Sequence, residues 1–230
     1  NSFDEVMILE LISIFESLNK LDEIRVILLT AEGKHFSAGA DLHWMKRIAN
    51  FTYEENLADA TQLAKLMQTI DTSPKTTIAL AHGSTYGGGI GLLACCDIVL
   101  ADEKAQFCFS EVRIGLMPAI ISPYIIRAIG SRQAKRLFLT AETFHVQEAL
   151  SIGLIHKIID SEQLFEAGYQ IANQILKNGP QALQATKKLL QNIEPNAINS
   201  EIIQQTIEAI ANIRVSKEAQ ERLSAFCATR

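Results

Sequence analysis

Two short runs of small residues stand where a protein backbone can bind an anionic oxygen. Residues 38–41 and 87–89 each follow a strand-like segment and precede a helical one. The start of a helix leaves N–H groups unpaired and carries a partial positive charge, and small residues let a ligand approach that backbone closely. If the two runs face each other, their N–H groups converge into an oxyanion hole. The glycines alone fit tight turns and close helix packing at least as well.

Other uses of glycine-rich loops lack their sequence signatures here. No Gly-Lys-Ser/Thr follows residues 87–91, as a phosphate-binding loop requires, and the spacing and acidic residue of a dinucleotide fingerprint are missing. The chain has no Gly-x-Ser-x-Gly elbow, and Ser37 and Ser84 lie in the wrong contexts for a serine hydrolase nucleophile. These three uses of the loops are therefore discounted.

The histidines and cysteines show no metal-ligand spacing. The histidines are His35, His43, His82, His145 and His156, and the cysteines are Cys95, Cys96, Cys108 and Cys227. Without a Cys-x-x-Cys pair, the cysteines are interpreted as reduced, mostly buried thiols of a cytoplasmic protein. No metal site is predicted.

Strands and helices alternate over the first two thirds of the chain. Strands are predicted at 24–30, 76–81 and 97–101, with a short one ending near Ser37. A long amphipathic helix is predicted over 54–71, because Pro74 ends it. This alternation indicates an α/β fold with a largely parallel sheet.

The two ends of the chain differ from this pattern. Ser2 and Glu5 have capping-box spacing, and Val6, Leu9, Ile12 and Leu18 then recur on one helical face. A domain rarely starts with a helix in this way, which favours strands that precede residue 1. From Ser122-Pro123 onward the chain is mostly helical, apart from a short strand at 154–159. We therefore predict an α/β core over 1–155 and a helical region over 156–230 for packing and oligomerisation.

Charge and hydropathy argue against nucleic-acid and membrane partners. The 230 residues carry a formal net charge of −5, and basic residues occur only as isolated pairs such as Lys46-Arg47. No apolar run is long enough to cross a bilayer, and no signal peptide is present.

Several ordered segments resemble the crotonase (enoyl-CoA hydratase/isomerase) family. They lie at 36–42, 87–97, 105–118, 127–130, 139–140 and 149–154. The resemblance covers nearly the whole chain. It implies a crotonase-like spiral of ββα units with a C-terminal helical trimerisation region, assembled as a homotrimer or a dimer of trimers.

The resemblance also implies roles for particular residues. The N–H groups of Ala40 and Gly88 would hold the thioester oxygen of an acyl-CoA, and Glu111 would move protons. The implied substrate contacts are Ala38, Ala40, Asp41, Leu42, His43, Gly88 and Gly91. Trp44 and Met45 are expected in the acyl pocket wall. No cofactor or metal is implied, since coenzyme A is part of the substrate.

One position departs from the family pattern. Hydratases of the family usually carry a first glutamate twenty residues ahead of the second, where this chain has Gly91. With Glu111 alone, either one carboxylate handles both water and proton transfer, or the reaction is double-bond isomerisation. If water activation limits hydration, Gly91→Glu is expected to raise its rate. A non-catalytic CoA-ester or RNA-binding protein is the alternative of another class, although the acidic charge argues against RNA.

Residues 95–97, 107–111 and 118–124 resemble a bacterial branch of the family assigned to methylglutaconyl-CoA and related branched substrates. In this branch, the Pro-Gly-x-Gly-Gly segment typical of the family is replaced by the sequence from Pro118 to Tyr124. The resemblance therefore predicts a hydratase of an α,β-unsaturated acyl-CoA of this type, acting in leucine degradation.

Overall fold

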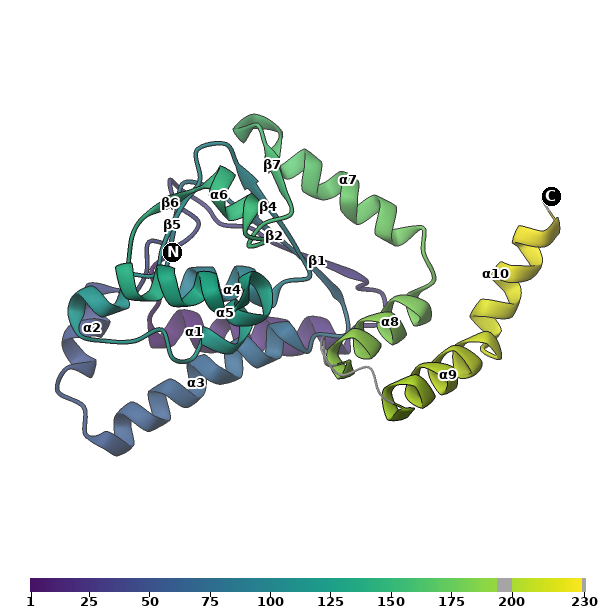
Figure 1. Ribbon diagram of the computed structural model, residues 1–230, viewed down its shortest axis with the longest axis horizontal. Coiled ribbons are helices and arrows are strands. Elements are labelled where there is room, and N and C mark those ends of the chain that lie inside the picture. The colour runs from purple at the N-terminus through teal and green to yellow at the C-terminus, as the bar shows by residue number, and fades with distance from the viewer. Residues whose placement is uncertain (194–199, 229–230) are drawn as a thin grey trace.

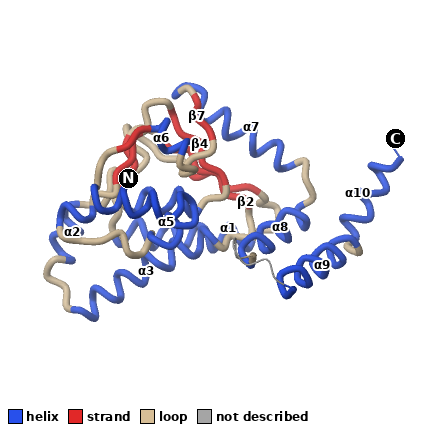
Figure 2. Tube along the Cα trace, viewed as in Figure 1, coloured by secondary structure: helices blue, strands red, loops and turns tan. Residues whose placement is uncertain are grey.

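The computed structural model describes residues 1–193 and 200–228. Two small sheets lie among layers of helices (Figures 1 and 2). The larger sheet is parallel and has the order β1 (Val26–Leu29), β2 (Thr76–Ala81), β4 (Ile98–Asp102), β7 (Lys157–Ile159). The smaller sheet has the order β3 (Ser84–Tyr86), β5 (Gln106–Cys108), β6 (Phe144–His145). The predicted α/β class with a parallel sheet is confirmed.

Both faces of the larger sheet are covered by helices. Ile78 and Leu80 of β2 pack against α7 (Leu164–Leu176), whereas the intervening Ala79 and Ala81 belong to the main core on the other face. Alternate residues of a strand point to opposite faces, and a parallel sheet buried on both faces carries apolar residues at nearly every position. This burial explains why the strands are short, continuous apolar runs.

Most helices of the main core match the expected ranges. They are α1 (Glu5–Lys20), α2 (Leu42–Ile48), α3 (Tyr53–Asp71), α4 (Gly88–Cys95), α5 (Ser122–Thr140) and α6 (Val146–Ser151), with short 3-10 turns η1 (Glu111–Ile114) and η2 (Ser161–Gln163). The predicted strand at 76–81 coincides with β2, and the predicted helix at 54–71 differs from α3 by one residue. The strand expected near Ser37 is reduced to a single β-bridge with Thr85.

The start of α1 differs from the sequence prediction. The Asp4 carboxylate, not Ser2, accepts the Met7 N–H at 2.8 Å and caps the helix. The buried face consists of Ile8, Ile12 and Phe15, whereas the predicted Val6 and Leu9 are exposed. The helix therefore starts two residues later than the spacing of Ser2 and Glu5 predicts, with an aspartate side chain accepting a free N–H of the first turn.

The division predicted at residue 155 also differs from the structure. β7 pairs with β4, and α7 packs on β1 and β2, so both belong to the sheet core although they lie beyond that boundary. The helices beyond them are α8 (Pro180–Asn192), α9 (Ser200–Arg214) and α10 (Lys217–Ala228). In Figure 1, α9 and α10 extend away from the body of the molecule. The separate helical region therefore begins at α8.

Two side chains of α10 tie it to α8 and to the end of α7. Glu218 accepts the N–H groups of Gln181 and Ala182 at 3.0 and 3.1 Å, and the Arg222 guanidinium donates to the Lys177 carbonyl at 3.0 Å. Glu218 thus caps the first turn of α8, which has no side-chain cap of its own.

Three cysteines are buried free thiols, as predicted: Cys95, Cys96 and Cys108. Burial raises the pKa of the Cys96 thiol to about 12, so this sulfur is a poor nucleophile. The side chain of Cys227 lies outside the described residues. Within the described ranges, every helix is too short or too polar to cross a bilayer.

Candidate active site

The first of the two small-residue loops is held beside β3 by backbone hydrogen bonds. Ser37 donates its N–H to the Ser84 carbonyl at 3.3 Å, and the Tyr86 N–H donates to the Ser37 carbonyl at 2.9 Å. Gly39 then turns the chain with a φ of +102°, a conformation that favours glycine. Asp41 begins α2 by accepting the N–H groups of His43 and Trp44. The loop is therefore fixed at both ends.

The residue between those fixed ends, Ala40, forms a parallel β-bridge with Phe3. Phe3 donates its N–H to the Gly39 carbonyl at 2.8 Å and accepts the Asp41 N–H at 2.7 Å. In such a bridge the bonds are made by the neighbours of the central residue. The N–H of Ala40 is thus left without an acceptor in the described part of the chain.

The second loop brings the start of α4 to the same place. Gly87 has a φ of +50° and donates its N–H to the Cys108 carbonyl at 3.1 Å. Gly88 is the first residue of α4, and its N–H has no acceptor among the residues that the structure describes. Two unpaired N–H groups, from Ala40 and Gly88, therefore line one cavity.

Glu111 lies against the second loop. It begins η1 just after β5, and its Oε1 lies 3.0 Å from the position that a Cβ atom on Gly87 would take. Its other oxygen, Oε2, is buried and has no hydrogen-bond partner in the described structure. Burial raises the pKa of the Glu111 carboxyl above its ordinary value. The site thus holds a carboxyl that is poised to bind a proton.

The cavity that these groups share has a volume of about 420 Å³ and walls that are mostly apolar. Trp44 of α2 forms part of the wall and donates its indole N–H to Asp59 at 3.2 Å, which fixes the ring against α3. Further apolar lining residues are Phe3, Leu42, Met45, Ile48, Leu63, Leu116, Met117, Pro118, Ile120 and Ile121. A cavity of this size and polarity suits an acyl chain whose polar end meets the unpaired N–H groups.

The structure gathers most, but not all, of the residues predicted for the site. Residues that line the cavity are Ala38, Ala40, Leu42, Trp44, Met45, Gly88 and Glu111. Asp41, His43 and Gly91 do not line it. Asp41 instead caps α2, and the hydrogen bond from the Trp44 N–H is the main reason why the pKa of its carboxyl is lowered.

Several residues that line the cavity carry no signal in the sequence. Phe3, Ile48, Leu63, Arg113 and Ile121 were not among the predicted contacts, yet all line the cavity. Ile48 and Leu63 lie on helices, where an apolar residue is fully explained by packing in the core. Phe3 is placed at the cavity by its single β-bridge with Ala40, and no strand pattern in the sequence predicts that bridge.

Gly91 lies in α4 beneath the cavity and is enclosed by other side chains. A Cβ atom there would lie 2.3 Å from Cγ2 of Ile121 and 3.1 Å from Cε of Met67. Ile121 therefore fills the space that a side chain at position 91 would need. The expectation that Gly91→Glu alone would raise hydration conflicts with this packing, because the new side chain would have to displace Ile121.

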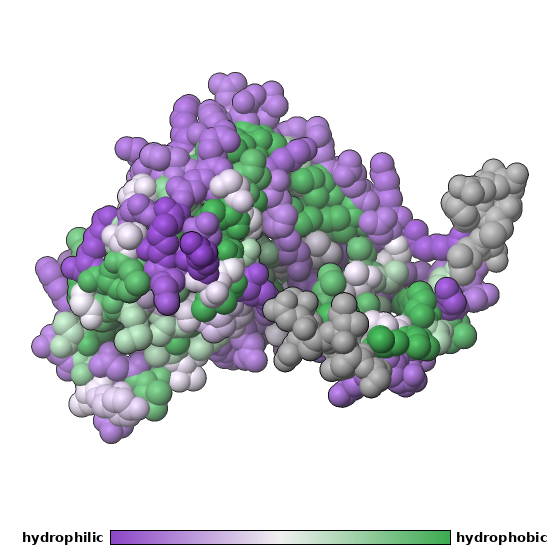
Figure 3. Space-filling model, viewed as in Figure 1, coloured by the Kyte–Doolittle hydropathy of each residue, from purple (hydrophilic) through white to green (hydrophobic). Residues whose placement is uncertain are grey.

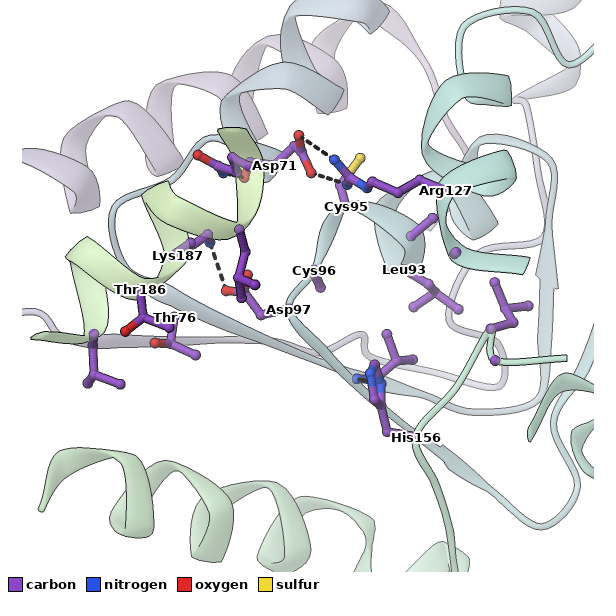
Figure 4. A pocket seen from close by; sticks show the side chains of 18 of the residues that line it. Asp71, Thr76, Leu93, Cys95, Cys96, Asp97, Arg127, His156, Thr186 and Lys187 are labelled. Atoms are coloured by element: carbon purple, nitrogen blue, oxygen red, sulfur yellow. Dashed lines mark hydrogen bonds and ion pairs between the residues drawn. The ribbon is translucent and has the colours of Figure 1, made fainter. Parts of the chain in front are cut away.

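A second, larger cavity of about 730 Å³ lies between α8 and the ends of α3, α4 and α5 (Figure 4). Its charged side chains face one another in two ion pairs, Asp71 with Arg127 and Asp97 with Lys187, the latter at 2.7 Å. The Cys95 thiol on its wall has a pKa raised by burial. His156 also lines this cavity, and its Nδ1 accepts the Val99 N–H at 3.0 Å. With its carboxylates in ion pairs, this cavity shows no unpartnered carboxyl like that of Glu111 among the described residues.

Comparison with known proteins agrees with this geometry. The sequence model of the family described as "Enoyl-CoA hydratase/isomerase" matches residues 1–227. A Thermus thermophilus protein assigned as an enoyl-CoA hydratase is 33% identical over 228 residues, which cover 98% of this chain and 89% of that protein. The mitochondrial Delta(3,5)-Delta(2,4)-dienoyl-CoA isomerase of Dictyostelium discoideum is 27% identical over 236 residues, covering 98% and 80% of the two chains.

Among solved structures, an enoyl-CoA hydratase from Shewanella pealeana superimposes with a TM-score of 0.96 at 47% identity, covering 100% of this chain and 86% of that one. This likeness confirms the predicted crotonase fold. With a family match over nearly its full length, the chain belongs to the enoyl-CoA hydratase/isomerase family.

Proposed function

We propose that this enzyme adds water to an α,β-unsaturated acyl-CoA thioester, with Glu111 as its single acid–base group. The observation that carries the proposal is the unpaired, buried Oε2 of Glu111 in the same cavity as the unpaired N–H groups of Ala40 and Gly88. A thioester oxygen between those N–H groups gains stabilisation as negative charge develops on it. The hydratase names among the relatives support this direction of chemistry.

The proton balance of the reaction is met by one carboxylate. Ionised Glu111 takes a proton from water while the water oxygen bonds to the β-carbon of the acyl group. The electrons of the double bond move onto the thioester, whose oxygen is held by the N–H groups of Ala40 and Gly88. Protonated Glu111 then returns a proton to the α-carbon, and the C–H bond forms as the enolate collapses. The net change is the addition of one water.

Double-bond isomerisation is the second candidate, and the packing of Gly91 favours it. Among the described residues, Glu111 is the one carboxylate that lines the cavity. At position 91, where the family usually has a second carboxylate, the chain has glycine, and Ile121 occupies the space beside it. Isomerisation of a 3-enoyl-CoA needs only that one base remove a proton from the α-carbon, giving an enolate held by the same N–H groups, and return it to the γ-carbon. The isomerase name of one relative agrees with this candidate.

Turnover of crotonyl-CoA, methylglutaconyl-CoA and a 3-enoyl-CoA, followed by mass spectrometry, separates the two reactions. Hydration adds the mass of one water, whereas isomerisation leaves the mass unaltered. Glu111→Gln is expected to lower kcat by about 10²–10⁴, the usual contribution of a general acid–base group, while CoA-ester binding persists. Glu208→Gln, a change at an exposed carboxylate on α9, serves as the control and is expected to retain full turnover. Full activity of Glu111→Gln would refute the assignment.

We further propose that the acyl group carries a carboxylate, as branched glutaconyl groups do. Arg113 supports this substrate class, because it is the only cationic side chain among the described lining residues. One of its N–H groups donates to the Ala141 carbonyl at 2.5 Å, which anchors the guanidinium and leaves its other donors for a ligand. Apolar walls beside it suit the branched carbon chain.

Arg113→Gln tests the substrate class. For a glutaconyl-type ester we expect KM to rise about tenfold, since a charge-assisted hydrogen bond contributes about 1.5–3 kcal/mol. For crotonyl-CoA, which has no second carboxylate, KM should change little. Equal effects on both esters would contradict a carboxylate-binding role and leave the role of Glu111 untouched.

A further inference from the structure

Phe3 touches both loops that carry the unpaired N–H groups. Its backbone bonds to Gly39 and Asp41 on either side of Ala40. Its ring packs on the other loop, since a Cβ atom on Gly88 would lie 3.4 Å from Cε2 and Cζ of the ring. The two loops also meet each other through the Ser37–Thr85 bridge, but that bridge lies several residues before each donor. Phe3 makes its contacts at the donors themselves.

The segment that carries Phe3 is fixed on both sides. Asn1 donates its side-chain amide to the carbonyls of Glu32 and His35 at 2.5 and 2.9 Å. Asp4 caps α1 through the Met7 N–H. Phe3 itself is only 3% exposed, and its ring lines the cavity next to the unpaired donors. The position of the Phe3 ring in the cavity is therefore fixed by the start of α1.

Small displacements of oxyanion donors have large effects on rate. Donors act when they lie about 2.7–3.1 Å from the oxygen that becomes charged, and a shift of about 1 Å costs about 10²-fold. The distance between the Ala40 and Gly88 N–H groups depends on what separates their two loops. On one side that separation is set by the thickness of the Phe3 ring.

We propose that Phe3 is a positioning residue that sets the spacing of the oxyanion donors Ala40 and Gly88. The inference rests on the proposed function, because it assumes that these N–H groups hold a thioester oxygen. The backbone of Phe3 orients Ala40, and its ring spaces Gly88 from that backbone. Phe3 does not need to touch the reacting atoms.

The carbonyl stretch of a bound thioester reports on donor geometry directly. With butyryl-CoA, an unreactive saturated ester labelled with ¹³C at the thioester carbon, difference infrared spectra compare bound and free carbonyl. In the unaltered enzyme we expect the bound band at lower wavenumber than in water. In Phe3→Leu the band should return part of the way towards the free value. kcat should fall about tenfold, less than the 10²–10³ that a lost donor costs, with KM nearly constant.

Phe15→Leu is the matched control. Phe15 is equally buried, at 2% exposed, and lies on α1 away from the cavity lining. This variant should lose stability while keeping kcat and the carbonyl band. If Phe3→Leu fails to fold, Phe3→Met offers a longer, flexible side chain that can still reach Gly88, and it is expected to show a smaller shift of the carbonyl band in the same direction.

A pair of substitutions tests the ring contact itself. Gly88→Ala places a methyl group 3.4 Å from the Phe3 ring, at the short limit of van der Waals contact, and a smaller residue at position 3 gives that methyl group more room. The double variant Phe3→Leu/Gly88→Ala should therefore lose less kcat than the product of the two single losses. Multiplicative losses, or a carbonyl band that Phe3→Leu leaves in place, would overturn the role of Phe3. An unshifted band in the unaltered enzyme would instead overturn the proposed oxyanion site.

Discussion

A half-buried carboxyl with one unpaired oxygen is the central residue of this site. Among the described residues Glu111 has no ion-pair partner, and burial raises its pKa because a charge in an apolar cavity loses hydration. Such a group is costly to keep, and the perturbed pKa is typical of a residue that exchanges protons. The buried Glu111 carboxyl therefore costs the fold stability, but it is suited to proton transfer.

The raised pKa predicts how activity and stability depend on pH. Water activation needs ionised Glu111, so kcat/KM should fall on acidification at a higher pH than for an ordinary glutamate. The folded protein binds the Glu111 proton more tightly than the unfolded chain does, so stability falls as pH rises from the ordinary glutamate pKa through the raised value. Glu111→Gln should therefore raise Tm at pH 7 by about 1–3 °C.

Thermal unfolding at pH 4 and pH 7 checks the sign of this prediction. At pH 4 both chains carry an uncharged side chain at position 111, so the gain in Tm should largely vanish. A Glu111→Gln variant that is less stable at pH 7 would mean that the ionised carboxylate is satisfied by contacts and is not a strained base.

The sequence could predict the chemistry-bearing residues but not their full surroundings. Gly88, Ala40 and Glu111 lie in segments whose order and spacing resemble a known family, and they meet in one cavity. Asp41 and His43 lie beside the same loop, yet the helix cap turns them away from the cavity lining. Contacts such as Phe3 depend on a tertiary bridge, which periodicity in a sequence does not encode.

At the scale of elements, strands and helices with strong periodicity were predictable. β2 contains a buried apolar run at 78–81 between Pro74 and Gly83, and α3 carries a capping box at Thr52 and Glu55. The short strands of the smaller sheet were missed, because three residues such as Ser84–Tyr86 contain no measurable alternation. The missed elements are thus those whose pairing comes from tertiary context.

The contact between α4 and α5 yields a prediction about the reaction. Gly91→Glu alone should reduce stability by about 1–3 kcal/mol, because the side chain meets Ile121 in a closely packed core. Ile121→Ala in the same chain removes the group that a Cβ at position 91 would strike first. The double variant Gly91→Glu/Ile121→Ala should therefore have a higher free energy of unfolding than the single variant Gly91→Glu. It should also hydrate crotonyl-CoA faster than the single variant.

Chemical denaturation and the crotonyl-CoA assay measure both effects. Ile121→Ala alone is the control for the loss of packing at α5. If the double variant regains stability but hydrates no faster than Ile121→Ala, the absence of a second carboxylate does not limit the rate.

At the scale of the whole molecule, the C-terminal helices leave apolar surface uncovered. Ile203, Ile207 and Ile210 recur at helical spacing on α9 and are each about half exposed. Green patches over α8 and α9 in Figure 3 show apolar side chains in this region. A homotrimer or a dimer of trimers, as the family resemblance implies, would cover such a stripe.

Light scattering after size-exclusion chromatography tests this assembly. We expect a mass that is three or six times the 25.4 kDa of one chain. Ile207→Lys places a charge in the stripe and should shift the mass towards a single chain. Glu201→Lys, also exposed but on another face of α9, should keep the assembly. A monomeric mass for the unaltered protein would rule out the trimer.

The interlocked pair of Gly91 and Ile121 also constrains how such a chain can evolve. A glutamate acquired first would crowd the core, and a smaller residue acquired first at position 121 would leave a void. Each single change is therefore expected to lower stability, whereas a paired exchange restores the packing. We expect chains of this fold that carry a glutamate in place of Gly91 to carry a residue smaller than isoleucine in place of Ile121.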